Sequence, residues 1–178
     1  MLTVSPEISA RASKVSVLLV DVDGVLTDGR IVYAEYGDEL KFFDVHDGFG
    51  LTLLNRAGIK LVIVTANKSK AVRHRAKDHR AAAVFQNSFD KLKAYDKILR
   101  KFRVQADEIC YIGDDLIDVP ILSRVGLSVC VANGNEEVRK ISHYVTTKKG
   151  GRGAVREVVE MILKSQGKWD ELVRRYHS

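Results

Sequence analysis

The chain has 178 residues, of which 46% are hydrophobic, so it suits one folded domain with a sizeable core and excludes a disordered or fibrous protein. A formal net charge of +6 favours anionic partners without separating nucleic acids from small phosphorylated molecules. No stretch approaches the ~18 apolar residues of a membrane span, and the N-terminus lacks a signal-peptide core. We therefore expect a cytoplasmic protein without membrane contacts, whose cysteines, Cys110 and Cys130, are reduced core residues.

Short apolar segments alternate with amphipathic ones, which is the pattern of a parallel sheet covered by helices on both faces. Pro6 after a serine predicts a short N-terminal helix before the first strand. The expected strands are 15–20, 59–64, 82–85, 109–112, 127–131 and 144–146. The expected helices are 48–57, 68–79, 89–103, 115–124, 135–141 and 152–165. The sequence thus predicts a Rossmann-like, doubly wound α/β fold, with residues 1–178 as a single domain.

One segment, about 30–45, breaks the alternation. Strand-forming residues lie on both sides of Gly37-Asp38, a dipeptide typical of hairpin turns. The hairpin would project beyond the carboxyl edge of the sheet, where open α/β sheets bind ligands, so we expect it to flank the functional site. The C-terminal tail, about 166–178, is either a frayed end or a segment that folds over a neighbouring subunit.

The stretch D-V-D-G-V-L-T-D-G directly follows the first predicted strand. Its first two acidic residues, Asp21 and Asp23, start on the same side of the chain, and Gly24 lets the backbone turn and offer its amide to an anion. A carboxylate that accepts a group, a second one that moves a proton and an exposed amide suit phosphoryl transfer. A calcium-binding EF-hand loop is excluded because Leu26 and Val32 stand where that loop needs Gly and Glu.

Polar residues also stand at the ends of three other predicted strands. Thr65 follows the strand at 59–64 and can bind a phosphate oxygen, while Lys91 lies near the start of the long helix, where an ammonium can neutralise a phosphate. Asp114 and Asp115 follow the strand at 109–112 and suit Mg²⁺, a cation that prefers oxygen ligands. Each of these residues alone would be ordinary, and they gain meaning from their combination.

In their order along the chain, these residues resemble the four motifs of the haloacid dehalogenase superfamily of aspartyl-phosphate phosphatases. The resemblance implies that Asp21 is the nucleophile and that Asp23 is the general acid and base. It implies that Mg²⁺ is held by the Asp21 carboxylate, the Asp23 backbone carbonyl and Asp114, with Asp115 in support. By the same resemblance Thr65 and Lys91 would hold the phosphoryl oxygens.

One family within this superfamily is similar over nearly the whole chain. The acidic stretch, the hairpin followed by F-D-V-H-D-G-F-G, G-D-D-L-I-D and the late G-G-R-G-A-V-R-E resemble the 3-deoxy-D-manno-octulosonate 8-phosphate phosphatases. The intervals between the motifs leave no room for a cap domain, as in uncapped members. The resemblance implies a homotetramer whose subunits help to close each other's sites, and release of a free eight-carbon sugar acid for lipopolysaccharide synthesis. The alternative is a nonulosonate 9-phosphate or another sugar phosphate.

The second motif departs from the octulosonate enzymes. Thr65 is followed by Ala66-Asn67, where those enzymes usually have Gly-Arg, and asparagine lacks the guanidinium that suits a sugar carboxylate. Lys68 or Lys70 is a candidate to replace the arginine. Arg152 either reaches a substrate carboxylate or belongs to a flexible loop. Asp47 either caps the helix at 48–57 or faces the substrate.

Two rival classes of function have weaker support. A phosphatase-like module that only oligomerises does not need Asp21, Asp23, Lys91 and Asp114 together. A nucleic-acid-end phosphatase draws on the basic segment 68–80, but its Lys and Arg residues are interleaved with alanines, lack aromatic neighbours for stacking and suit a solvated helix face. We therefore expect a Mg²⁺-dependent phosphatase acting on a small phosphorylated sugar acid, with no nucleic-acid partner.

Overall fold

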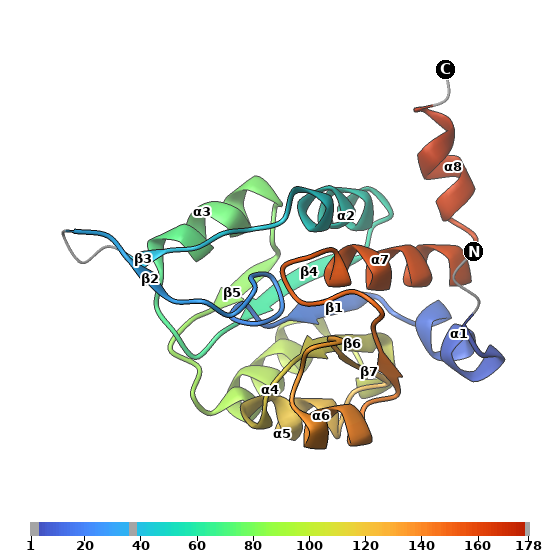
Figure 1. Ribbon diagram of the computed structural model, residues 1–178. Helices are drawn as coiled ribbons and strands as arrows, with labels where there is room; N and C mark the ends of the chain where they lie inside the picture. Colours follow the sequence, from blue (N-terminus) through green and yellow to red (C-terminus); the bar gives the residue numbers. More distant parts are fainter. Residues whose placement is uncertain (1–3, 36–38, 177–178) are drawn as a thin grey trace.

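The computed structural model describes residues 4–35 and 39–176 (Figure 1). Six strands form one parallel sheet in the order β5-β4-β1-β6-β7-β8. The chain therefore winds outward from β1 in one direction and then from β6 in the other, which is the order of doubly wound α/β folds, and the predicted fold class is confirmed. The strands are β1 Val17–Val20, β4 Lys60–Val64, β5 Ala83–Phe85, β6 Ile109–Gly113, β7 Leu127–Cys130 and β8 Tyr144–Val145.

The sheet is buried on both faces because alternate residues of each central strand face opposite sides. In β1, Leu18 and Val20 pack with one core cluster and Val17 and Leu19 with the other. Figure 1 shows α2 and α7 on one side of the sheet and α4, α5 and α6 on the other. The helices are α1 Pro6–Ser13, α2 Val45–Arg56, α3 Lys70–Asp78, α4 Lys91–Phe102, α5 Val119–Leu122, α6 Glu136–Ile141, α7 Ala154–Ser165 and α8 Trp169–Arg174. This double cover fixes the ends of the central strands.

The helix expected over 115–124 is broken into two short pieces. A 3-10 turn, η2 Leu116–Asp118, precedes α5. The Asp118 carboxylate accepts hydrogen bonds from the backbone amides of Asp114 and Asp115, and the Asp115 carboxylate accepts one from Leu116. Side chains that bind nearby amides compete with regular helix formation, so this loop is shaped by its carboxylates rather than by helix periodicity.

Strands β2 Val32–Tyr33 and β3 Glu39–Leu40 form a separate antiparallel pair between β1 and α2. Figure 1 shows the pair projecting beyond the main sheet, as the sequence predicted. The expected turn at Gly37-Asp38 lies outside the described residues. Five large apolar side chains of this segment are exposed, namely Ile31, Tyr33, Leu40, Phe42 and Val45.

The described part of the C-terminal tail, through residue 176, is not frayed. It forms α8, in which Leu172 is buried and the Trp169 ring packs against the core beneath the cations of Arg156 and Lys164. In Figure 1, α8 stands at the end of the molecule away from β2 and β3. The tail is thus ordered by contacts within its own chain.

Both cysteines are free and buried in the core, as predicted. Burial raises the pKa of Cys130 to about 12, and it also raises the pKa of Cys110, so neither thiol is readily ionised. Within the described ranges, none of the helices combines the length and apolar character needed to cross a bilayer.

Asp47 caps a different helix from the one expected. Asp44 caps α2, because its carboxylate accepts the amides of His46 and Asp47. Asp47 itself is fully buried, and its two carboxylate oxygens accept the amides of Gly153 and Arg156 at 3.2 and 2.7 Å. These amides belong to the start of α7, whose own N-cap residue is a glycine. The structure thus corrects the expected cap: Asp44 caps α2, and Asp47 caps α7.

The contribution of the Asp47 carboxyl to the free energy of unfolding should fall as the pH rises. Burial raises the pKa of this carboxyl from 3.8 to about 6, although the two backbone hydrogen bonds oppose the shift. Because the folded state binds the proton more tightly, the stabilisation is complete below about pH 4 and is lost as the pH rises through 6. The free energy of unfolding of the wild type, relative to Asp47→Asn, should therefore fall by up to about 3 kcal/mol between pH 4 and 7.

Urea denaturation of both proteins at each pH measures this difference, because the other titrating groups are common to both. A difference that stays constant would show that the dipole of α7 balances the burial of the carboxyl, and a difference that rises with pH would show that the dipole outweighs it; either result contradicts the prediction.

Candidate active site

The site lies where the chain reverses its winding direction. In the sheet Val20 is paired with Ile63 on one side and with Ile112 on the other. Residues just past these strand ends therefore lie at one level along the carboxyl edge. Asp21 follows β1, Thr65 follows β4 and Asp114 follows β6. The sheet register thus brings together three of the predicted residues that lie far apart in the sequence.

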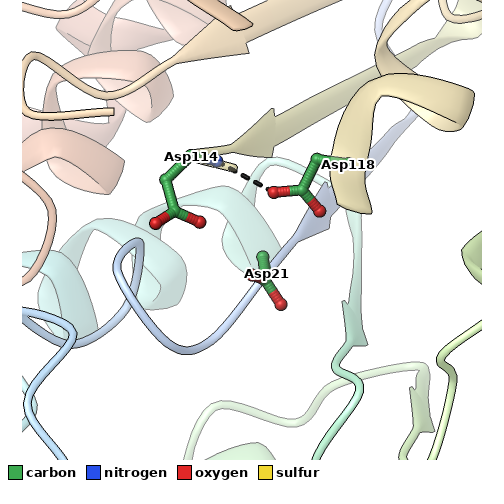
Figure 2. Close-up of side chains that lie close together, drawn as sticks. All are labelled: Asp21, Asp114 and Asp118. Atoms are coloured by element: carbon green, nitrogen blue, oxygen red, sulfur yellow. Dashed lines mark hydrogen bonds between the residues drawn. The ribbon is translucent and has the colours of Figure 1, made fainter. Parts of the chain in front are cut away.

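Three carboxylates converge at this edge: those of Asp21, Asp114 and Asp118 (Figure 2). One carboxylate oxygen from each residue lies within 4.8 Å of those of the other two. Asp118 is fully buried and is held in place by the amide of Asp114, at 2.9 Å, which Figure 2 marks with a dashed line. The sequence analysis did not select Asp118, although G-D-D-L-I-D placed it one helical turn after Asp114. Asp115 lies outside this cluster, exposed, with its carboxylate on the amide of Leu116.

Lys91, the first residue of α4, brings an ammonium into this cluster. Its Nζ lies 3.0 Å from Asp21 Oδ1 and donates to Asp118 and to the Tyr111 hydroxyl. The side chain is 1% exposed, so these contacts are made out of water. Tyr111, from the middle of β6, also donates to Asp118. A buried ammonium held by two carboxylates stays charged, because their attraction outweighs the burial that alone would lower the pKa of Lys91.

The charge of the cluster fits a divalent cation. When all three carboxylates are ionised, the one ammonium, which contacts Asp21 and Asp118, leaves two negative charges uncompensated in a largely buried place. Burial, together with the neighbouring carboxylates, raises the pKa of Asp21 to about 7 and that of Asp114 to about 8. A cation of charge two beside these oxygens would remove that repulsion, and Mg²⁺ prefers such hard oxygen ligands. The donor set of Asp21 and Asp114, with Asp118 behind them, therefore suits Mg²⁺.

The loop after Asp21 is shaped by close backbone approach. Gly24 has a φ of +93°, and a Cβ at this position would overlap the Asp114 carboxylate. Its amide is bonded to the hydroxyl of Thr27 at 3.4 Å. A Cβ at Gly150, in the late G-G-R-G loop, would overlap the carbonyl of Gly24. Gly24 thus lets the acidic loop pack against Asp114, and Gly150 lets the late loop pack against the acidic loop.

Asp23 stands apart from the carboxylate cluster and has its own partners. Its Oδ1 accepts a hydrogen bond from Lys41 Nζ, and its Oδ2 accepts one from Asn67 Nδ2 at 2.9 Å. Lys41 follows β3 and also donates to Glu39 at 2.7 Å. The sequence analysis did not find Lys41, because no local pattern ties a hairpin lysine to a carboxylate that lies so far before it.

Thr65 is buried at the end of β4, and its hydroxyl accepts the amide of Asn67 at 3.2 Å. This bond closes a tight turn that directs the Asn67 side chain to Asp23. Ala66-Asn67, the pair that departs from the expected Gly-Arg, thus gives this chain a second contact to Asp23.

The other candidate substrate residues lie farther out. Arg152 is largely exposed and pairs with Asp28 of the acidic loop at 3.4 Å. Lys68 lines a different surface hollow along α3, together with Arg73, Lys77 and Arg80. The structure therefore associates Arg152 with the active-site loop, whereas the contacts of Lys68 lie elsewhere.

Comparisons with known proteins agree with this geometry. Residues 65–158 match the haloacid dehalogenase-like hydrolases. The 3-deoxy-D-manno-octulosonate 8-phosphate phosphatase of Yersinia pestis is 42% identical over 165 residues, which cover 93% of this chain and 88% of that relative.

Two solved structures extend the comparison. The 3-deoxy-D-manno-octulosonate 8-phosphate phosphatase of Moraxella catarrhalis, in complex with magnesium ion, phosphate ion and KDO, is 41% identical, with a TM-score of 0.93 over 96% of this chain and 98% of that one. The cobalt-bound enzyme of Haemophilus influenzae is 34% identical, with a TM-score of 0.86 over 89% and 92%. The chain belongs to the 3-deoxy-D-manno-octulosonate 8-phosphate phosphatase family of haloacid dehalogenase-like hydrolases.

Proposed function

We propose that this chain is a Mg²⁺-dependent phosphatase that hydrolyses 3-deoxy-D-manno-octulosonate 8-phosphate to the free sugar acid and phosphate. The observation that carries the proposal is the cluster of three carboxylates around Lys91, which has the charge and the ligands for a divalent cation and an anionic substrate. Support for the substrate comes from the Moraxella catarrhalis relative, whose structure holds magnesium, phosphate and KDO. The same proposal includes a cytoplasmic location and a role in lipopolysaccharide precursor synthesis.

In this proposal Asp21 is the nucleophile. One of its carboxylate oxygens forms a bond to phosphorus while the bond between phosphorus and the sugar oxygen breaks, and Asp23 gives its proton to that leaving oxygen. Asp23 then takes a proton from a water molecule, whose oxygen attacks the aspartyl phosphate. Inorganic phosphate leaves, and the Asp21 carboxylate is restored.

The other proposed site residues hold the metal or offset the negative charge of the phosphoryl group. Asp21, Asp114 and the backbone carbonyl of Asp23 would hold Mg²⁺, which would supply positive charge beside the phosphoryl oxygens. Lys91 touches Asp21 at 3.0 Å, so it lies beside any phosphoryl group transferred to that carboxylate. Gly24 and Thr65 complete the proposed phosphate-binding set, and Asp115 supports the metal from outside the cluster.

The alternative substrate is a nonulosonate 9-phosphate or another sugar phosphate, and Asn67 is the residue that keeps this alternative open. This side chain is bonded to Asp23 and has no guanidinium to offer a sugar carboxylate. Arg152, exposed beside the acidic loop, is the proposed replacement, and Lys68 is the second candidate.

Assembly into a homotetramer of single-domain subunits is the last part of the proposal. It is supported by the five exposed apolar side chains that are grouped in the β2–β3 segment, because grouped apolar side chains on a surface mark sites of protein contact.

The first prediction concerns substrate and nucleophile. Phosphate release should be fastest from octulosonate 8-phosphate among a panel containing nonulosonate 9-phosphate and common sugar phosphates, and EDTA should abolish it. Asp21→Asn should lower kcat by on the order of 10³-fold or more, because the amide cannot form the acyl phosphate. Preference for another ester would contradict the proposed substrate but leave the proposed mechanism intact. Phosphate release that is independent of Asp21 would overturn the mechanism.

Two adjacent aspartates provide a matched test of the metal site. Asp114→Asn should raise the Mg²⁺ concentration for half-maximal phosphate release by roughly 10- to 100-fold, because it removes a carboxylate of the cluster. Asp115→Asn should raise it by a clearly smaller factor, because Asp115 lies outside the cluster, with its carboxylate on the amide of Leu116. Equal effects of the two substitutions would contradict this assignment.

Light scattering after size-exclusion chromatography should give a mass about four times the 19.9 kDa of one chain. Replacing both Tyr33 and Phe42 by Asp should lower that mass, because the charges would be buried in the proposed interface. Phe89→Asp is the control, since Phe89 is as exposed as Tyr33, at 71% against 73%, but lies outside the β2–β3 segment. A monomer for the wild type, or the same dissociation for the control, would refute this role of the segment.

A further inference from the structure

Asp23 is held on both of its carboxylate oxygens by side chains from outside the motif. Lys41 donates to one of its oxygens and Asn67 donates to the other. The first donor lies just after β3, and the second lies in the turn after β4. Two segments that are distant in the chain therefore fix one side chain from opposite sides.

The Lys41 ammonium is withdrawn from water almost completely. Its side chain is 1% exposed, while those of its partners Asp23 and Glu39 are 21% and 19% exposed. Burying an ammonium is costly unless carboxylates compensate it, so this arrangement persists only because both carboxylates face it. The contact between Lys41 and Asp23 is thus a largely buried ion pair and not a solvated surface pair.

The geometry favours positioning over substrate binding for Lys41. Lys41 contacts Asp23 and Glu39, whereas the phosphoryl group would be received by Asp21, which Lys91 contacts. Two of the three N–H groups of its ammonium are already used by Asp23 and Glu39. The carboxylate of Asp23 keeps some exposure, so the side chain that Lys41 holds is the one that can meet a leaving group.

We propose that Lys41 and Asn67 are positioning residues for Asp23, which they hold in the one orientation that delivers its proton to the leaving oxygen. This inference rests on the proposed function, in which Asp23 is the general acid. It gives the β2–β3 segment a part in the chemistry of its own subunit, in addition to any contact with a neighbour. It also gives Asn67, which stands where the octulosonate enzymes usually have arginine, a defined task.

The choice of leaving group tests this inference. An alkyl phosphate, such as a sugar phosphate, needs a proton on its leaving oxygen, whereas p-nitrophenyl phosphate releases a stable phenolate without one. Asp21 would attack the phosphorus of either ester, and the same Mg²⁺ site would serve both. A residue that positions the acid should therefore matter for cleavage of the first ester and much less for cleavage of the second.

The experiment compares the wild type with Lys41→Met and Asn67→Ala under single-turnover conditions, with Mg²⁺ present and enzyme in excess. Release of the sugar acid should slow at least about 10-fold in Lys41→Met, while release of nitrophenolate should slow by less than about 3-fold. Asn67→Ala should show the same selectivity with a smaller loss. In steady state, kcat for the sugar phosphate should fall, and KM should stay within about 3-fold.

Lys97→Met, at an exposed position of α4, is the matched control and should leave both rates unchanged. Thermal unfolding of each variant reports whether it is folded. Asn67 is exposed, so Asn67→Ala keeps the test valid even if Lys41→Met unfolds. The double variant should lose less than the product of the two single losses, because both donors hold one carboxylate.

Equal slowing of both esters would overturn the inference and make Lys41 a structural residue. A rise in KM alone would overturn it by assigning Lys41 to substrate binding, and unchanged rates would overturn it directly. Any alkyl phosphate that the wild type cleaves in an Asp21-dependent manner serves for the comparison. If the wild type prefers another sugar phosphate, only the proposed substrate is wrong and the inference can still be tested. If the wild type cleaves no alkyl phosphate in an Asp21-dependent manner, both the proposed function and the inference are refuted.

Discussion

The arrangement on which the rest of the site depends is the set of three carboxylates around the Lys91 ammonium at the ends of β1 and β6. Negative charges so close together repel one another in a buried place, and burial raises the pKa of Asp21 and Asp114. One lysine offsets only part of that repulsion. The remaining negative charge attracts a further positive charge. The site is therefore suited to a divalent cation, which in turn stabilises the charge that develops during phosphoryl transfer.

Such an arrangement needs a rigid frame, and the sheet provides it. The strands that carry Asp21 and Asp114 are hydrogen-bonded neighbours, packed on both faces, so neither carboxylate can retreat from the other. Asp118 tightens the same frame from the following turn, where it binds two amides as well as Lys91 and Tyr111. The close approach of the Gly24 and Gly150 backbones then fixes the loop that carries Asp23.

Two acidic side chains near the start of α2 cap two neighbouring helices. Asp44 caps α2 and Asp47, one turn later, caps the neighbouring helix α7, so one acidic segment satisfies the starts of two helices. Tertiary packing placed α7 against α2, and Asp47 was then buried with backbone amides as its partners. In the same way β2–β3, which looks like a separate appendage in Figure 1, reaches the acidic loop through Lys41.

The sequence by itself determined the order of strands and helices, the parallel sheet and the family, because apolar periodicity and the short acidic motifs are local properties. It also indicated Asp21, Thr65, Lys91 and Asp114, since polar residues that follow buried strands stand out in one dimension. Only the tertiary structure decided the partners of each side chain: Asp118 within the carboxylate cluster, Lys41 and Asn67 on Asp23, and Asp47 on α7. Those contacts join residues far apart in the chain, and their geometry follows from sheet register and helix packing, which no local pattern encodes.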